Sequence, residues 1–187
     1  MIFKELSIKG VFSIDLNPIS DSRGFFMRTY DSNFFELNNL NTNWVHENHS
    51  TSVNKGTIRG FHFQYPPYSE IKLVRIVKGS VLDIFLDIRK NSPTFGKWGS
   101  IKLSSDNKKC LYLPKGIAHG MCTLENNTTM VYKVDTAYEP KFEDQIKWND
   151  ADINVDWPDF NNITISEKDK EANSFADFKK SSGGILV

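Results

Sequence analysis

The sequence predicts an all-β fold, an antiparallel sandwich or barrel with a few short helices. From about Leu73 to Val134, short runs of β-branched and aromatic residues are separated by turn residues, which is the pattern of such folds. Helical periodicity is weak, and the chain has no internal repeat or coiled-coil heptad. Because 187 residues can bury a substantial core, we expect one domain.

Several of these runs flank tight-turn residues and predict three hairpins. Glycine and asparagine suit such turns because they tolerate the backbone conformations that a tight reversal needs. The hairpins run from Ile71–Val77 through Lys78-Gly79 into Val81–Ile88, from Trp98–Leu103 through Asp106-Asn107 into Cys110–Leu113, and from Gly120–Leu124 through Asn126-Asn127 into Thr129–Val134.

Helix start signals occur at two places. Asp31 or Ser32 is expected to cap a short helix over Phe34–Leu40, and Ser166 a helix that begins at Glu167. The last residues contain Ser-Ser-Gly-Gly and predict a flexible end. We therefore expect one domain over residues 1–172 and a C-terminal tail over residues 173–187.

The charges are balanced. Lysine plus arginine total 23, as do aspartate plus glutamate, so no net field favours a nucleic-acid or membrane partner. The first residues lack the pattern of a secretory signal, and no apolar run approaches the roughly 20 residues that span a bilayer. We expect a cytoplasmic protein. Cys110 and Cys122 lack metal-binding spacing and are expected to be reduced core thiols.

Polar side chains fall on apolar faces of two predicted strands. Alternation places Lys72 on one face with Val74 and Ile76, and Tyr132 on one face with Met130. In a barrel that is not simply filled, such inward polar groups would line a ligand cavity. Alternatively, Lys72 extends to the barrel mouth and Tyr132 bonds a backbone carbonyl.

The stretch GTIRGFHFQ, residues 56–64, places a histidine in a strand. Alternation puts Gly60, His62 and Gln64 on one face and Arg59, Phe61 and Phe63 on the other. A lone strand histidine is often a hydrogen-bonded core residue. It is also the side chain whose ordinary pKa, near neutrality, suits proton transfer, and both interpretations remain open for His62.

Two stretches, GTIRGFHFQYPPYSEIKLVRIVKGSVLDIFLDIR at residues 56–89 and PKGIAHG at residues 114–120, closely resemble the dTDP-4-dehydrorhamnose 3,5-epimerase family. The resemblance covers roughly residues 5–172. Further matches, in the family's order and spacing, are Arg23-Gly24-Phe25-Phe26, Asn48-His49-Ser50, Ser92-Pro93-Thr94-Phe95-Gly96, Tyr132, Tyr138 with Pro140, Trp148-Asn149-Asp150 and Ser166-Glu167-Lys168-Asp169.

The resemblance implies a double-stranded β-helix, the cupin jelly-roll barrel, in a homodimer. It implies an isomerase that acts on a nucleotide-linked 4-keto-6-deoxy sugar without a cofactor, in the biosynthesis of a rhamnose-like deoxysugar. Cupins commonly hold a metal with a His-x-His pair and a later histidine, but here the pair reads His62-Phe63-Gln64. His62 and His119 then lack a third ligand, unless Glu70 supplies it, and we expect no metal.

The resemblance also implies roles in proton transfer. Inverting a carbon beside a ketone needs a base on one face, stabilisation of the enolate, and an acid on the other face. By resemblance His62 is the base, Asp169 orients it, Lys72 lies near the enolate oxygen, and Tyr132 is the acid. From the residues alone, Ser166-x-x-Asp169 reads as a helix capping box, and the two readings are compatible.

Other matches imply contacts to the sugar nucleotide. Arg59 and Arg23 would bind the diphosphate, because the guanidinium fork can bind two oxygens at once. By resemblance Arg23 and Phe26 reach into the partner's site, and His119 bonds the sugar, unless it ties down the turn at residues 114–116. Further implied contacts are Glu47, Asn48, Tyr138, Glu143 and Lys168. The alternative for each of these exposed basic residues is that it is a solvated surface side chain that contacts no ligand.

Two positions depart from the family pattern. Arg28 stands where the family usually has a glutamate that touches the nucleotide, and His46 stands where it usually has glutamine. The nucleotide is therefore open between dTDP, CDP, GDP and UDP. The alternatives to double epimerisation are inversion at carbon 3 alone, keto-isomerisation, binding of a sugar nucleotide without turnover, and metal-dependent oxygenation.

Overall fold

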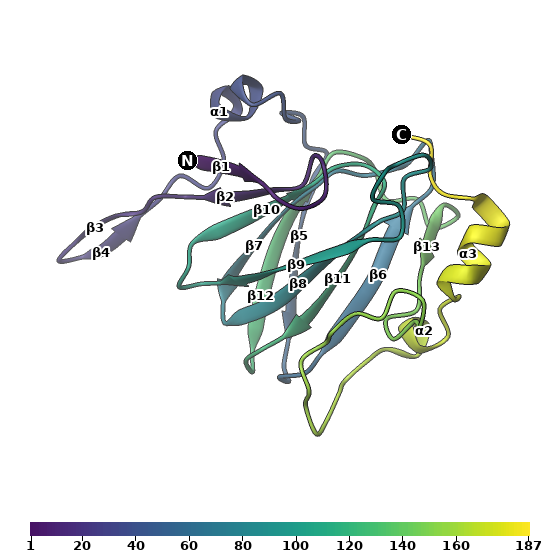
Figure 1. Ribbon diagram of the computed structural model, residues 1–187. Helices are drawn as coiled ribbons and strands as arrows, with labels where there is room; N and C mark the ends of the chain where they lie inside the picture. Colours follow the sequence, from purple (N-terminus) through teal and green to yellow (C-terminus); the bar gives the residue numbers. More distant parts are fainter.

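Two antiparallel sheets face each other in a computed structural model of the chain, which describes residues 1–187 (Figure 1). Every pair of neighbouring named strands is antiparallel. The six-stranded sheet has the order β1 (Ile2–Glu5), β2 (Phe12–Asp15), β10 (Lys109–Leu113), β7 (Lys72–Lys78), β12 (Thr128–Val134) and β5 (His46–Ser52). The five-stranded sheet has the order β13 (Glu143–Gln145), β6 (Ile58–Gln64), β11 (Ile117–Thr123), β8 (Ser80–Asp87) and β9 (Trp98–Ser104).

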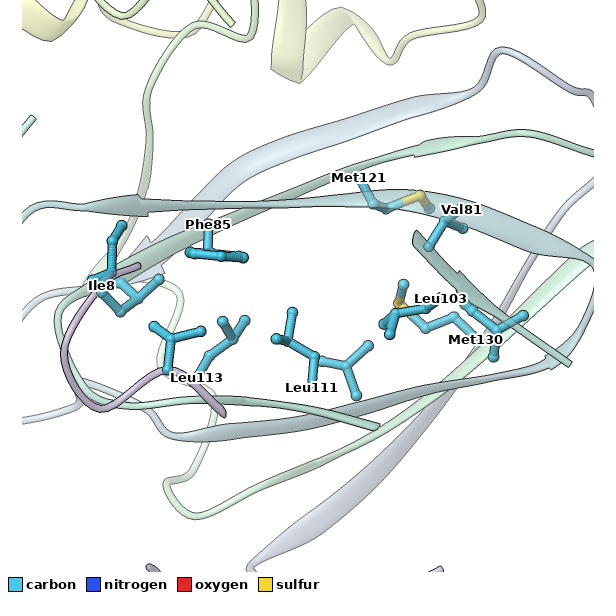
Figure 2. Packing of buried hydrophobic residues seen from close by; sticks show 12 residues of the cluster. Ile8, Val81, Phe85, Leu103, Leu111, Leu113, Met121 and Met130 are labelled. Carbon is cyan, nitrogen blue, oxygen red and sulfur yellow. The ribbon is translucent and has the colours of Figure 1, made fainter. Parts of the chain in front are cut away.

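The main core lies between the sheets, as Figure 2 shows. Both sheets contribute aliphatic side chains, such as Val74 and Leu111 from one and Val81 and Phe85 from the other. Burying such side chains stabilises the fold by roughly 1.5–3 kcal/mol each. The predicted faces are confirmed here, because Val74 and Ile76 belong to this cluster and Tyr132 packs against it.

The three predicted hairpins are wrong in their pairing, although their strands are present. β7 and β8, β9 and β10, and β11 and β12 each lie in different sheets, so the turns between them carry the chain from one sheet to the other. Apolar alternation is the same whether the next strand pairs edge to edge or packs across the core, so the pattern cannot separate the two. Among consecutive strands, only β1 with β2, β8 with β9, and the short β3 (Ile19–Asp21) with β4 (Gly24–Phe26) are paired.

The predicted caps are confirmed, although the first helix spans residues 32–37 and not the predicted 34–40. Asp31 caps α1 (Ser32–Leu37) by accepting a bond from the Asn33 N–H, and Ser166 caps α2 (Glu167–Lys170). None of the helices is long and apolar enough to cross a membrane.

The C-terminal segment differs from the flexible tail that the sequence predicts. Residues 175–182 form α3 (Phe175–Ser182), and Phe175 and Phe178 are buried in a second cluster with Phe61 and Phe63 on the outer face of the five-stranded sheet. The glycines there end the helix instead of loosening the chain, because Gly183 adopts the left-handed C-cap conformation. The segment is therefore packed against the sheet rather than frayed.

Both cysteines are free and buried, as the sequence predicts. Burial raises the pKa of Cys110 to about 12 and that of Cys122 to about 11, so neither is a reactive thiolate near neutral pH.

Candidate active site

Two cavities lie at the polar end of the space between the sheets. The larger has a volume of about 270 Å³ and the smaller about 140 Å³. Both are lined by His62, Lys72 and Tyr132, which come from β6, β7 and β12. Met121 and Met130 line the smaller cavity and also belong to the main core, so the apolar core forms its floor.

The strand that carries His62 departs from regular alternation at Gly60. The register of β6 on β11 shifts beyond the His62–His119 pair, and as a result Arg59 and His62 line the same cavity. Regular alternation places them on opposite faces, so that expectation is wrong. Gly60 permits the close approach: its φ is +118°, and an added Cβ would lie 2.5 Å from both Gly120 Cα and the His119 carbonyl oxygen.

His62 is backed by a carboxylate. Its Nε2 lies 2.6 Å from Asp169 Oδ1, and the side chains are 33% and 4% exposed. Burial alone would raise the pKa of Asp169, but the hydrogen bond and charge of His62 outweigh it and hold that pKa below its ordinary value. The backbone N–H of Asp169 also donates to Ser166 Oγ, so the residue occupies the capping box and contacts His62 at once.

Lys72 lies in an ion pair rather than at the mouth of the barrel. It is buried, and its Nζ is 2.7 Å from Glu70 Oε1, which also lies in the larger cavity. Tyr132 makes no hydrogen bond to a backbone carbonyl, so the alternative for that residue is not seen either.

His119 extends into the smaller cavity and does not tie down the turn at residues 114–116. Its Nε2 lies 2.9 Å and 3.0 Å from the two oxygens of Asp83, a fully buried carboxylate on β8. Burial raises the pKa of Asp83, and the charges of His119 and Lys72 act against that rise.

The mouth of the larger cavity carries further residues that the resemblance implies. Tyr138 Oη donates to Glu143 Oε2 at 2.8 Å, and Lys168 Nζ lies 2.5 Å from the same oxygen. Burial would raise the pKa of Glu143, but these two partners outweigh it and lower that pKa. Because Glu143 bonds it, Tyr138 has a raised pKa. Asn48 lines this cavity as well, together with His46.

Asp169 and Lys168 bond the lining residues His62 and Glu143 but do not line the cavities themselves, and four further residues named from the sequence do not line them either. Glu47 alternates with His46 and Asn48 on β5, points to the other side, and pairs with Lys133 at 2.8 Å. The other three, Arg23, Phe26 and Arg28, lie on or beside the β3–β4 hairpin, which extends away from the two sheets (Figure 1). Arg23 pairs with Asp21, and Arg28 with Asp31.

Sequence reasoning missed Asp83 and gave Glu70 only a metal-binding role. Asp83 lies between Val81 and Phe85 on the inward face of β8, so the alternation that picked out Lys72 would also have found it. Glu70 precedes β7 and offered no periodic signal. No group of three or more histidine, cysteine or acidic side chains has the arrangement of a metal site.

Comparisons with known proteins agree with the resemblance. A family model described as dTDP-4-dehydrorhamnose 3,5-epimerase matches residues 5–177. The dTDP-4-dehydrorhamnose 3,5-epimerase of Shigella flexneri is 42% identical over 171 residues, which are 91% of this chain and 93% of that protein.

Solved structures are similar over nearly the whole chain. A dTDP-6-deoxy-D-glucose-3,5-epimerase from Legionella pneumophila, in complex with dTDP-4-keto-L-rhamnose, is 32% identical with a TM-score of 0.92 and covers 100% of this chain and 98% of its own. A 3′-monoepimerase from Streptomyces bikiniensis, in complex with dTDP-quinovose, is 27% identical with a TM-score of 0.91 and covers 97% and 91%.

Proposed function

The chain belongs to the dTDP-4-dehydrorhamnose 3,5-epimerase family, whose members are isomerases, and from that premise we propose that it inverts carbons 3 and 5 of a dTDP-linked 4-keto-6-deoxyhexose. The observation that carries the proposal is the cavity lined by His62, Lys72 and Tyr132, with Asp169 behind the histidine. Both carbons flank the ketone at carbon 4, so their protons are the acidic ones of the sugar.

The first step removes one of these protons. His62 Nε2 bonds the ionised Asp169, so a proton on Nε2 leaves Nδ1 as the nitrogen with a free lone pair. Nδ1 takes the proton from carbon. The C–H electrons form a double bond to carbon 4 of the sugar, the carbonyl oxygen becomes the enolate oxygen, and Asp169 stabilises the imidazolium that results.

The second step returns a proton to the other face. The ammonium of Lys72, buried in the same cavity, stabilises the negative enolate oxygen far more strongly than it would in water. The Tyr132 hydroxyl gives its proton to the carbon and the enolate collapses to the ketone. One proton is removed and one is added, so the product is an isomer and no cofactor is consumed. His62 then gives its proton to solvent and Tyr132 takes one from solvent, which restores the enzyme.

We propose that the two sheets form a cupin jelly roll and that the enzyme is a homodimer. The order of strands supports the first, because consecutive strands from β5 to β8 and from β9 to β12 alternate between the sheets. The exposed β3–β4 hairpin supports the second, since Ile19 and Phe26 are 74% and 68% exposed. Arg23, beside them, would then contact the diphosphate in the partner's cavity.

The test of the chemistry is proton NMR in deuterium oxide with a dTDP-linked 4-keto-6-deoxy sugar, followed by the CDP-, GDP- and UDP-linked sugars. We expect deuterium at carbons 3 and 5 and its loss in His62→Ala, whereas Tyr132→Phe keeps the base and should lose inversion of the two carbons. Deuterium at carbon 3 alone would instead assign the activity of the 3′-monoepimerase relative. Binding without exchange for any nucleotide would refute catalysis and leave a sugar-nucleotide-binding protein.

The test of the shared site is complementation. His62→Ala and Arg23→Ala proteins are each expected to be inactive, but mixed dimers contain one site with an intact His62 from one chain and an intact Arg23 from the other. Mixing the two proteins and letting their subunits exchange should therefore restore activity at one of the two sites in each mixed dimer. No recovery, despite mixed dimers seen by native mass spectrometry, would show that Arg23 acts within its own chain.

A further inference from the structure

The site contains a second histidine–carboxylate pair beside the first. His62 and His119 are cross-strand partners on β6 and β11, and each bonds a carboxylate through Nε2: His62 to Asp169, His119 to Asp83. Neither Nδ1 has a hydrogen-bond partner in the protein, and neither is a fully buried atom, so both are accessible from the cavities.

The two carboxylates differ in their surroundings. The side chain of Asp83 is 0% exposed and its only hydrogen-bond partner is His119, whereas Asp169 lies beside Lys168 on a surface helix and its histidine is a third exposed. Burial raises the pKa of Asp83, while the contacts of Asp169 lower its pKa. When the surroundings shift the pKa values of two groups in one site in opposite directions, the two groups are suited to different roles, one as acid and one as base.

The difference determines where protons reside. A fully buried pair with a net charge of −1 is costly, so the Asp83–His119 pair favours holding one extra proton. That proton lies either on Asp83 or on Nε2 of His119, and in both arrangements Nδ1 of His119 also carries a hydrogen. The Asp169–His62 pair, with its carboxylate ionised, leaves Nδ1 of His62 free to accept a proton.

The other charged and titratable groups that face the Asp83–His119 pair are Arg59 and His62 from β6, Lys72 from β7 and Tyr132 from β12. The charge of Lys72 acts on Asp83 and favours loss of the extra proton. Glu70 lies 2.7 Å from the Lys72 ammonium and offsets this effect.

We propose that Asp83 is a positioning residue that keeps a hydrogen on Nδ1 of His119, so that His119 donates a hydrogen bond to the substrate oxygen on which negative charge develops. This deepens the proposed function and rests on it. Lys72 and His119 would then supply a cation and a hydrogen-bond donor to the same oxygen, while His62 acts as the base. No proton leaves His119 in this step.

The first test is a long-range ¹H–¹⁵N spectrum of the full-length protein with ¹⁵N-labelled histidine, assigned with His119→Gln. In the wild-type protein at pH 7 we expect Nδ1 of His119 to be protonated. In Asp83→Leu no side chain holds the extra proton or bonds Nε2, and a neutral imidazole without a partner prefers the Nε2–H tautomer, so we expect Nδ1 to be mostly unprotonated at the same pH. An unprotonated Nδ1 in the wild type, or the same spectrum in both proteins, would overturn the proposal.

The second test is the rate of deuterium exchange in the two proteins between pH 5 and 9. Loss of one donor to a developing oxyanion lowers kcat on the order of 10²-fold, with little effect on KM. In Asp83→Leu, His119 gains the Nδ1 hydrogen mainly by taking up a proton from solvent. The ratio of variant to wild-type kcat should therefore rise as pH falls, because pH effects that the two proteins share cancel in the ratio.

A merely structural role for Asp83 would leave that ratio constant with pH, and a role in binding alone would raise KM at unchanged kcat; either result refutes the proposal. If Asp83→Leu does not fold, His119→Gln and His119→Leu serve instead. Glutamine keeps an N–H donor and should retain at least tenfold more kcat than leucine, and equal rates would refute donation. If the wild type catalyses no exchange at all, the proposed function fails, whereas the spectrum still decides where the proton resides.

Discussion

Replacing Asp169 with asparagine separates the two contacts of this residue. The substitution removes the charge that lies 2.6 Å from His62 Nε2 but leaves the backbone N–H that donates to Ser166 Oγ. The carboxylate side chain is 4% exposed, so water cannot take its place. A general base contributes roughly 10²- to 10⁴-fold to a rate, and we expect Asp169→Asn to lower kcat by about 10³-fold.

The same substitution should affect stability only slightly. His62 is 33% exposed, so solvent screens the lost charge, and asparagine can still accept the Nε2–H bond. We expect a loss of about 1 kcal/mol or less at pH 7. Ser166→Ala is the matched control: it removes the cap, which costs about 1 kcal/mol, and keeps the carboxylate beside His62.

The assays are deuterium exchange for kcat and urea denaturation for the free energy of unfolding. Ser166→Ala should keep its rate within tenfold of the wild type. If Asp169→Asn retains more than a tenth of the wild-type rate, or if the two variants lose rate equally, the carboxylate of Asp169 is not the partner of the base.

The remaining predictions concern stability. The pKa of Asp169 is held below its ordinary value, so the wild type should have a larger free energy of unfolding than Asp169→Asn above the unfolded-state pKa of about 3.9. This difference should disappear as pH falls through the lower native pKa, and urea denaturation at a series of acidic pH values would check it. Glu70→Gln leaves the buried Lys72 ammonium unpaired and should cost about 2–3 kcal/mol in urea denaturation; a neutral result would contradict the ion pair. Gly60→Ala should destabilise at least about 2 kcal/mol more than Gly24→Ala, because both have positive φ but only Gly60 meets backbone atoms, and equal melting temperatures would rule out this close contact. Phe178→Ala should cost about 3 kcal/mol if α3 is packed as described, whereas a frayed segment would lose almost nothing.

Local patterns predicted the features that depend on neighbouring residues in the chain. The strand segments, the caps at Asp31 and Ser166, and the inward faces of Lys72 and Tyr132 all follow from side-chain chemistry and a period of two. The resemblance, carried by ordered motifs, predicted the family.

Local patterns failed where a long-range choice decides the structure. The stretch after Asn173 has the composition of a tail, but Phe175 and Phe178 find an apolar surface on the outer face of a sheet that forms from distant segments. Arg59 and His62 share a cavity because Gly60 allows β6 to shift on β11, and one strand's sequence does not contain that contact.

The sequence by itself determined the all-β class, the inward polar residues and, through its motifs, the family. The tertiary structure alone decided which strands pair and what each inward side chain meets. A period of two fixes only the direction of a side chain, whereas hydrogen-bond partners and burial depend on the strands that pack opposite it. The pairs His62–Asp169 and His119–Asp83 join residues 107 and 36 positions apart, and the depth at which each pair is buried depends on the strands and helix that pack around it.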